Sequence, residues 1–151
     1  GSENSFYMYP IRFDSNTFGI SRNAFVQAVS AELPKAKYWD TTPLAEAYVK
    51  PLYINKIYEN KIALGSKGFP FNFNKDRHYE YKKGDCPVTE NLYEKELIIT
   101  PLISEGLELE DLDDFCAAIH KVIENIDEVR KSDVSSAGIF DPLAAIEDNV
   151  E

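Results

Sequence analysis

The sequence predicts an α+β fold, in which a small antiparallel sheet is packed with helices. Short stretches of β-favouring residues occur at 6–13 and 97–101. Apolar residues recur at helical spacing over 21–33 and again over 109–130. The long apolar strands typical of a parallel sheet are few. We therefore expect the two strand segments to lie in one sheet, covered by the two helical segments.

The length and composition are those of a single domain. The chain has 151 residues, and its 44% hydrophobic content is enough to fill a core. No apolar run approaches the ~20 residues that a membrane-spanning helix needs, so we expect no membrane partner. Cys86 and Cys116 show no disulfide spacing, and we interpret them as reduced thiols of a cytoplasmic protein.

The net charge of −10 is concentrated in the C-terminal part of the chain. Residues 105–151 hold 14 acidic and 3 basic residues, whereas residues 1–104 hold 12 and 13. No basic stripe is present that would displace counterions from a nucleic acid, so we expect no nucleic-acid partner. We divide the chain into an expression tag, Gly1-Ser2, a domain over 3–131 and an acidic tail over 132–151.

The first elements follow from turn and capping residues. Pro10 interrupts the β-rich stretch 6–13, which indicates an edge strand or a bulge. Ser21 is a good N-cap for the first helix, and Pro34 ends that helix. Residues 35–40 form a candidate second strand.

The middle of the chain contains the candidate site. The stretch "AYVKPLY" (47–53) places Tyr48, Lys50 and Tyr53 beside a backbone that proline restricts. These residues fit either an aromatic corner of the core or a binding site. The connection 60–86 that follows is long, and a loop of this length in a compact domain is usually functional or part of an interface.

A short helix and a strand are predicted in "GDCPVTENLYEKELIITPL" (84–102). Pro87 suits the first position of a helix, and Glu90 complements the helix dipole in the first turn. The β-favouring run 97–100 follows directly, and Pro101 ends it. We expect a helix that leads straight into a buried strand.

The last helix has an apolar stripe, with acidic residues at its start and Arg130 and Lys131 at its end. We expect four of its side chains to be buried: Leu112, Phe115, Ile119 and Val122.

Motifs that carry chemistry are scarce. Cys116 and His120 lie four residues apart, but a zinc site needs further ligands, so we expect no metal. "GSKG" (65–68) is neither a P-loop nor a dinucleotide fingerprint, and a turn accounts for it better. These residues alone do not identify a catalytic site.

The segment from Gly84 onward closely resembles the C-terminal signature of the DegT/DnrJ/StrS family of pyridoxal-phosphate (PLP) aminotransferases, which act mostly on nucleotide-linked keto-sugars and on keto-inositols. The matching residues are Cys86-Pro87, Glu90, Tyr93, Leu97, Pro101-Leu102 and Gly106-Leu107. "YPIRFD" (9–14) and "GISRNAFVQAVSAE" (19–32) are similar to the family's entry into its small domain. "YVKPLY" (48–53) is similar to a segment of members related to amino-sugar and aminocyclitol biosynthesis. Glu108 stands where the family often has threonine as the helix cap.

The resemblance implies the C-terminal domain of a fold-type I aminotransferase. Such a parent enzyme would transfer an amino group from an amino acid to a keto-sugar or keto-cyclitol. Its implied partners are its own N-terminal PLP domain, a second subunit in a homodimer and the keto-sugar substrate. In the parent, Tyr48, Lys50 and Tyr53 would be substrate-binding residues.

PLP is implied for the parent enzyme and not for this chain by itself. The family's cofactor lysine precedes the small domain, and no lysine here lies in the matching motif. We therefore expect no catalytic residue in this chain, and we expect it to be inactive alone. The alternative is a stand-alone, non-catalytic binding module of the same fold.

Overall fold

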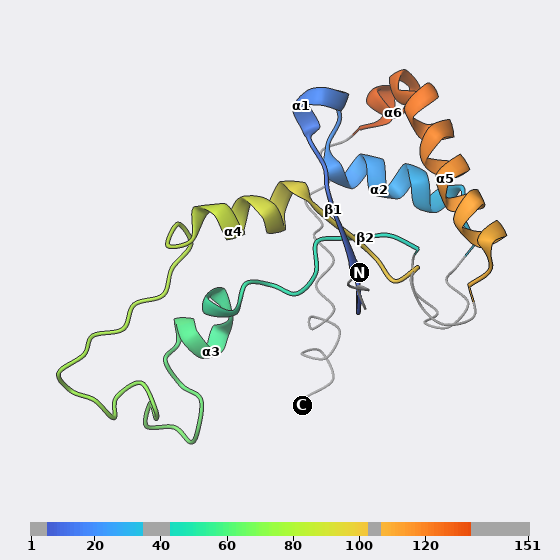
Figure 1. Cartoon of the computed structure of the whole chain (residues 1–151). Helices are drawn as coiled ribbons and strands as arrows, with labels where there is room; N and C mark the ends of the chain where they lie inside the picture. The colour runs from blue at the N-terminus through green and yellow to red at the C-terminus, as the bar shows by residue number, and fades with distance from the viewer. Residues whose placement is uncertain (1–5, 35–42, 103–106, 134–151) are drawn as a thin grey trace, which may run out of the picture. The chain divides into compact units, whose positions relative to one another are not determined.

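The computed structural model describes residues 6–34, 43–102 and 107–133 (Figure 1). The chain divides into two compact units. Within the described residues, the first unit runs to Tyr48 and resumes at Glu94, and the second unit is Val49–Tyr93. The predicted strand at 35–40 and the acidic tail beyond residue 133 lie outside the described residues.

Among the described residues, the first unit contains a three-stranded antiparallel sheet in the order β1–β3–β2. Its strands are β1 (Tyr9–Arg12), β2 (Ala45–Glu46) and β3 (Leu97–Thr100). The register of β1 and β3 places Pro10 opposite Ile99 and Arg12 opposite Leu97. Proline cannot donate a ladder hydrogen bond, so the edge position of β1 confirms what Pro10 predicts.

The helices of the first unit are α1 (Ser15–Phe18), α2 (Arg22–Ala31), α5 (Leu109–Glu124) and α6 (Ile126–Ser132). Helix α2 packs against β2 and β3 and also against α5 and α6. Ser21 caps α2, because its hydroxyl accepts a hydrogen bond from the backbone N–H of Ala24 at 3.1 Å. The predicted α+β fold with an antiparallel sheet and packed helices is confirmed.

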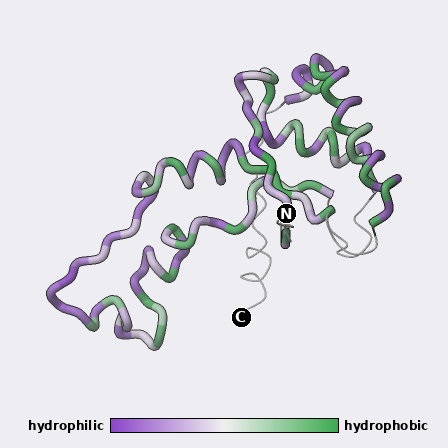
Figure 2. The backbone as a smooth tube through the Cα atoms, in the orientation of Figure 1, coloured by the Kyte–Doolittle hydropathy of each residue, from purple (hydrophilic) through white to green (hydrophobic). Residues whose placement is uncertain are grey.

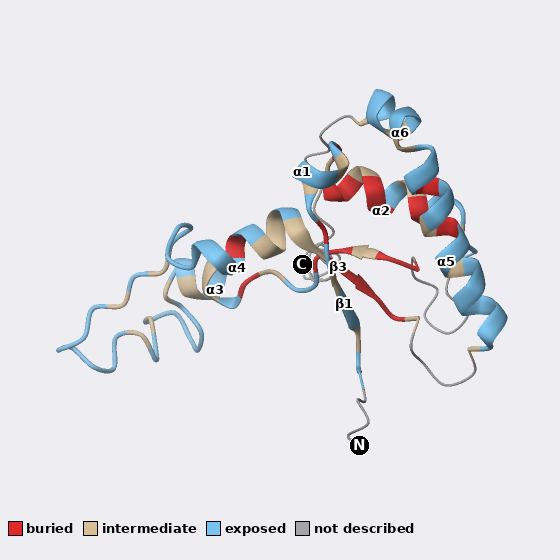
Figure 3. Ribbon diagram, turned by 45° about the horizontal axis from the view of Figure 1, so that its top comes forward, coloured by how far each residue is buried: buried red, intermediate tan, exposed pale blue. Residues whose placement is uncertain are grey.

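The core of the first unit is where these elements meet, and its buried residues are coloured red in Figure 3. Phe13, Phe18 and Phe25 contribute a cluster of aromatic rings, with the centroids of Phe13 and Phe25 4.9 Å apart. The buried members of the core are Phe13, Ile20, Phe25, Val26, Val29, Leu44, Ile98, Ala118 and Val122.

The predicted burial of the α5 stripe is only partly correct. Val122 is buried, whereas Phe115 and Ile119 are half-buried at the edge of the core. The prediction for Leu112 is wrong, because 40% of its surface is exposed. The contacts of α5 with the core begin at Phe115, and apolar and polar residues alternate along the whole helix (Figure 2). Helical periodicity therefore identifies the apolar stripe but not how far the core extends beneath it.

The second unit consists of short elements and turns. Its elements are η1 (Leu52–Ile54), α3 (Lys56–Glu59) and α4 (Pro87–Asn91), and the π-helix η2 (Leu92–Glu96) continues α4 into β3. The predicted helix that leads directly into a buried strand is thus confirmed. Residues 60–86 form turns and one isolated bridge between Leu64 and Phe69.

An aromatic cluster is the main internal packing of the second unit. Tyr58, Phe71 and Tyr81 meet edge to face, with ring centroids 5.3, 5.8 and 6.2 Å apart. Within 49–93, all of which the structure describes, no large apolar side chain is buried. The second unit is accordingly drawn almost wholly in pale blue and tan in Figure 3.

Candidate functional site

The predicted site residues belong to two different units. Tyr48 lies in the first unit, where its ring meets that of Tyr7 edge to face at 6.5 Å. Lys50 and Tyr53 lie in the second unit, and both are half-buried. A shared role of these three side chains at the rim of a substrate cleft therefore stays a prediction.

The hydroxyl of Tyr53 has a specific partner, the carboxylate of Glu90. Tyr53 donates to Glu90 Oε1, and the same oxygen accepts from the backbone N–H of Gly84 at 2.7 Å and of Cys86 at 3.4 Å. Glu90 is only 7% exposed, so these donors compensate for the burial of its charge. Through these hydrogen bonds Glu90, in α4, connects the Gly84–Cys86 turn with η1, which carries Tyr53.

The hydrogen bond changes the acidity of both partners. Donation from Tyr53, followed by the two backbone N–H groups, holds the pKa of the Glu90 carboxyl below its ordinary value against the effect of burial. Burial and the neighbouring carboxylate raise the pKa of Tyr53 to about 12. At neutral pH the tyrosine is therefore a neutral donor and the glutamate a charged acceptor.

Replacing Tyr53 by phenylalanine is expected to raise the pKa of Glu90 toward its ordinary value. A carboxyl whose pKa is lowered by folding stabilises the fold above its unfolded pKa and loses that contribution as the pH falls through its folded pKa. The variant should therefore lose the order of its second unit at higher pH than the unmodified chain. Carboxyl NMR titration of Glu90 measures the shift, and Tyr79→Phe is the matched control. An unchanged Glu90 titration would contradict the hydrogen bond.

Arg22 is the most deeply buried charged residue that the structure describes in the first unit, with 1% of its surface exposed. Its guanidinium donates to the carbonyl oxygens of Leu97 at 2.6 Å and Glu94 at 2.9 Å, and to Asn23 Oδ1 at 2.7 Å. The Glu94 carbonyl lies in the last turn of η2, where a helix leaves its carbonyl groups without intrahelical partners. Arg22 thereby fixes the start of α2 to the junction of η2 and β3.

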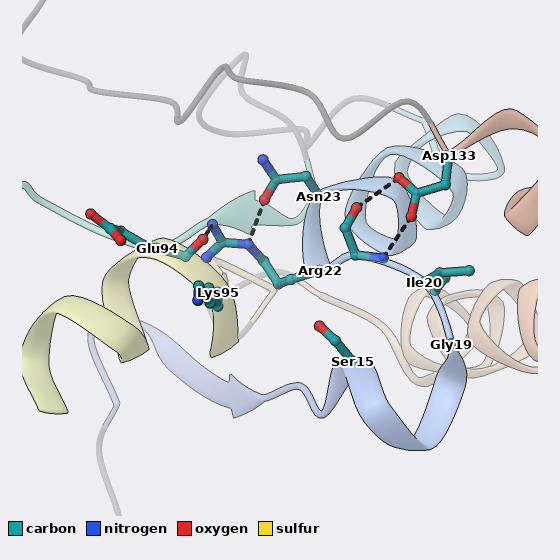
Figure 4. A pocket seen from close by; sticks show the side chains of 9 residues that line it. Ser15, Gly19, Ile20, Arg22, Asn23, Glu94, Lys95 and Asp133 are labelled. Atoms are coloured by element: carbon teal, nitrogen blue, oxygen red, sulfur yellow. Dashed lines mark hydrogen bonds between the residues drawn. The ribbon is translucent and has the colours of Figure 1, made fainter. Parts of the chain in front are cut away.

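Helix α6 fixes the turn between α1 and α2. Arg130 donates to the carbonyl oxygens of Phe18 at 2.9 Å and Gly19 at 3.2 Å, which end α1. Asp133 accepts from the backbone N–H of Ser21 at 2.7 Å and from its hydroxyl at 2.9 Å (Figure 4). Each charge complements the helix end that it contacts.

A polar hollow of about 450 Å³ lies beside this turn. Arg22 in its wall donates to carbonyl groups, and Asp133 accepts from the backbone N–H and the hydroxyl of Ser21, the N-cap of α2 (Figure 4). The lining residues are Ser15, Gly19, Ile20, Ser21, Arg22, Asn23, Glu94, Lys95 and Asp133. A carboxylate of the chain itself therefore lies at the start of α2.

Carboxylates of the chain itself accept hydrogen bonds from backbone N–H groups at the starts of two helices, α2 and α5. A site for the phosphate of PLP needs N–H donors, commonly at a helix N-terminus, near a lysine that reaches the reacting carbon. Asp133 takes the start of α2, and Asp111 accepts from the backbone N–H of Glu108 at 2.9 Å at the start of α5. Among the residues described, no cluster of three metal-ligating side chains occurs either.

The chain alone is expected to give no specific PLP adduct. Exposed lysines react slowly with the free aldehyde, so a yellow colour decides nothing. Borohydride trapping at low PLP, followed by peptide mapping, should find partial labelling spread over several lysines. Stoichiometric labelling of a single lysine, together with measurable amino transfer, would place an active site in this chain.

Sequence reasoning missed the structural roles of Arg22 and Asp133. Arg22 follows a capping serine, where an arginine normally faces solvent, and no spacing indicates that it points inward. Asp133 lies 112 positions from Ser21 in sequence, so local pattern gives no signal for this contact. For Glu90 the sequence pattern indicates only a contact with the helix dipole, although its position four residues after Cys86 also suits acceptance from the preceding turn.

The fold and these contacts define a small α+β domain with a polar hollow and an exposed second unit. No family model, curated protein or solved structure matches the chain. No helix in the ranges the structure covers has the length and apolar character to cross a membrane.

Proposed function

We propose that this chain is the C-terminal small domain of a PLP-dependent aminotransferase that transfers an amino group from an amino acid to a keto-sugar or keto-cyclitol. In this proposal the N-terminal domain of the parent supplies PLP and its lysine. The present domain contributes a wall of the cleft, and the parent is a homodimer in the cytoplasm.

The observation that supports the proposal is the way the motif segments fit together. "YPIR" pairs with "LIIT" in the sheet, and Arg22 of "GISR" binds the carbonyl groups that lead into "LIIT". Glu90 of the Cys-Pro segment binds the turn before its own helix. The residues that carry the resemblance thus have structural roles, as expected of a domain that supports an active site built elsewhere.

The complete reading frame of the gene provides the test. An upstream PLP domain is expected, and the full product should transfer amino groups to at least one member of a panel of keto-sugars and keto-inositols. A native start codon just before Glu3, or no transfer to any ketone of the panel by a PLP-loaded product, would reject the proposal.

Lys50→Ala in the parent enzyme is expected to raise KM for the keto substrate by roughly tenfold or more, because a hydrogen bond from a charged group is worth about 1.5–3 kcal/mol. The melting temperature should change little, since Lys50 is only half-buried. Lys56→Ala, at an exposed lysine of the same unit, is the matched control. Unchanged kinetics for Lys50→Ala would remove Lys50 from the site.

A second candidate function is a non-catalytic interaction module. The exposed apolar side chains of the second unit favour it, because large exposed apolar patches commonly mark contacts with other proteins. A reading frame without a PLP domain, in a chain that binds another protein, would support this candidate.

A further inference from the structure

Glu46 is a carboxyl group that is buried with little hydrogen bonding. Only 8% of its surface is exposed, and it lies in β2, at one edge of the described sheet, where β2 packs against α2. Its Oε1 accepts from the side-chain amide of Gln27 in α2 at 3.5 Å, which is long for a hydrogen bond. Among the described residues, no donor meets its buried Oε2. A buried carboxylate needs close partners, so the ionised form of Glu46 is unfavourable in this position.

The charged groups around Glu46 compensate only in part for its burial. In α2, Arg22 is the one titratable residue, and its guanidinium attracts the carboxylate while it also donates to backbone carbonyl groups. The neighbouring strand β3, all of which the structure describes, carries no titratable side chain. Burial outweighs the effects of Arg22 and Gln27, and it raises the pKa of the Glu46 carboxyl above its ordinary value.

The strand that carries Glu46 is short, and the residue after it is strained. β2 has two residues, and Ala47, which follows it, has a φ of 64°. This left-handed conformation favours glycine and is unfavourable for alanine. The backbone N–H of Ala47 donates to the carbonyl oxygen of Leu97 at 2.8 Å, and this hydrogen bond holds the end of β2 on β3. Opening of β2 would therefore relax Ala47 and admit water to Glu46.

We propose that β2 is a pH-sensitive edge of the sheet, which is closed on β3 and α2 while Glu46 is protonated and opens when Glu46 ionises. In the closed state the carboxyl group is buried and neutral. In the open state water hydrates the carboxylate, so ionisation favours the open state. The inference does not rest on the proposed function, because all the residues involved lie in the first unit and no cofactor takes part.

The direction of the pH dependence follows from the raised pKa of Glu46. A carboxyl group whose pKa is higher in the closed state stabilises that state fully below the pKa of the open state. This contribution is lost as the pH rises through the pKa of the closed state. The opening constant of β2 should therefore rise about tenfold for each pH unit between the ordinary pKa of glutamate and the pKa of closed Glu46, and then level off.

Hydrogen exchange of the Ala47 N–H measures this opening. Exchange is followed by NMR from below the ordinary pKa of glutamate to neutral pH, and each rate is corrected for the intrinsic pH dependence of exchange. The N–H of Phe13, which donates to the Glu96 carbonyl oxygen at 2.8 Å beside β1, is the internal reference. The opening constant at Ala47 should exceed that at Phe13 at every pH, and it should level off where carboxyl NMR shows Glu46 to titrate.

Two variants of Glu46 remove the ionisable group. Glu46→Gln keeps the shape of the side chain, and its opening constant at Ala47 should no longer change with pH. Glu46→Met makes the same test if the glutamine variant does not fold. Glu124→Gln, at an exposed glutamate of α5, is the control and should keep the pH dependence of the unmodified chain.

An opening constant at Ala47 that does not depend on pH in the unmodified chain would overturn the proposal. A pKa of Glu46 at or below its ordinary value would also overturn it. Equal opening constants at Ala47 and Phe13 would mean that the first unit unfolds as a whole, which rejects an opening confined to β2. A pH dependence that persists in Glu46→Gln would reject Glu46 as the group that governs the opening.

Discussion

Arg22→Met is expected to lower the free energy of unfolding by about 3–5 kcal/mol, the largest single effect that we predict for a polar residue. Methionine retains the apolar stem but removes the guanidinium. Asn23 Oδ1 and the Glu94 carbonyl then lose the Arg22 donor, whereas the Leu97 carbonyl keeps the backbone N–H of Ala47 at 2.8 Å. Each hydrogen bond to a charged group contributes about 1.5–3 kcal/mol. Urea denaturation followed by circular dichroism measures the change.

Arg12→Met is the matched control for this measurement. Arg12 donates to Glu96 Oε2 at 2.7 Å, but 76% of its side chain is exposed. An exposed ion pair of this kind contributes about 0–1 kcal/mol, so the control should lose at most about that much. Equal losses for the two arginine variants would mean that burial of Arg22 does not govern its contribution.

The sequence was a good guide where local pattern and global fold agree. Pro10 predicted an edge strand, Ser21 a helix cap and Pro87 a helix start, and each of these positions depends on a preference of the residue's own backbone or side chain. These conformational preferences are the same in the folded protein, so the structure at such positions can be predicted without knowing which residues pack around them.

The sequence was a poor guide to contacts between distant segments. The carbonyl partners of Arg22 are 72 and 75 positions away in the sequence. The amino-acid sequence of α2 does not distinguish an arginine that points into the core from one that faces solvent. The predicted substrate contacts of Tyr48, Lys50 and Tyr53 depend on the same kind of information. For Tyr53 the structure adds a partner, Glu90, that competes for its hydroxyl.

Ile98→Ala is expected to lower the free energy of unfolding by about 2–5 kcal/mol, as large-to-small changes in a packed core do. Ile98 lies in the central strand, has no exposed surface and belongs to the core that α2 and α5 complete. Truncation would leave a cavity between the sheet and the helices, which the surrounding side chains fill only in part.

Leu112→Ala is the comparison that tests how far the core extends. The same kind of truncation should cost less than about 0.5 kcal/mol here, because Leu112 is 40% exposed and lies beyond the core contacts of α5. Both variants are measured by urea denaturation at a concentration where the chain is monomeric, so that association contributes nothing to the difference. A large loss for Leu112→Ala under these conditions would mean that the apolar stripe is buried along its whole length, as helical periodicity alone predicts.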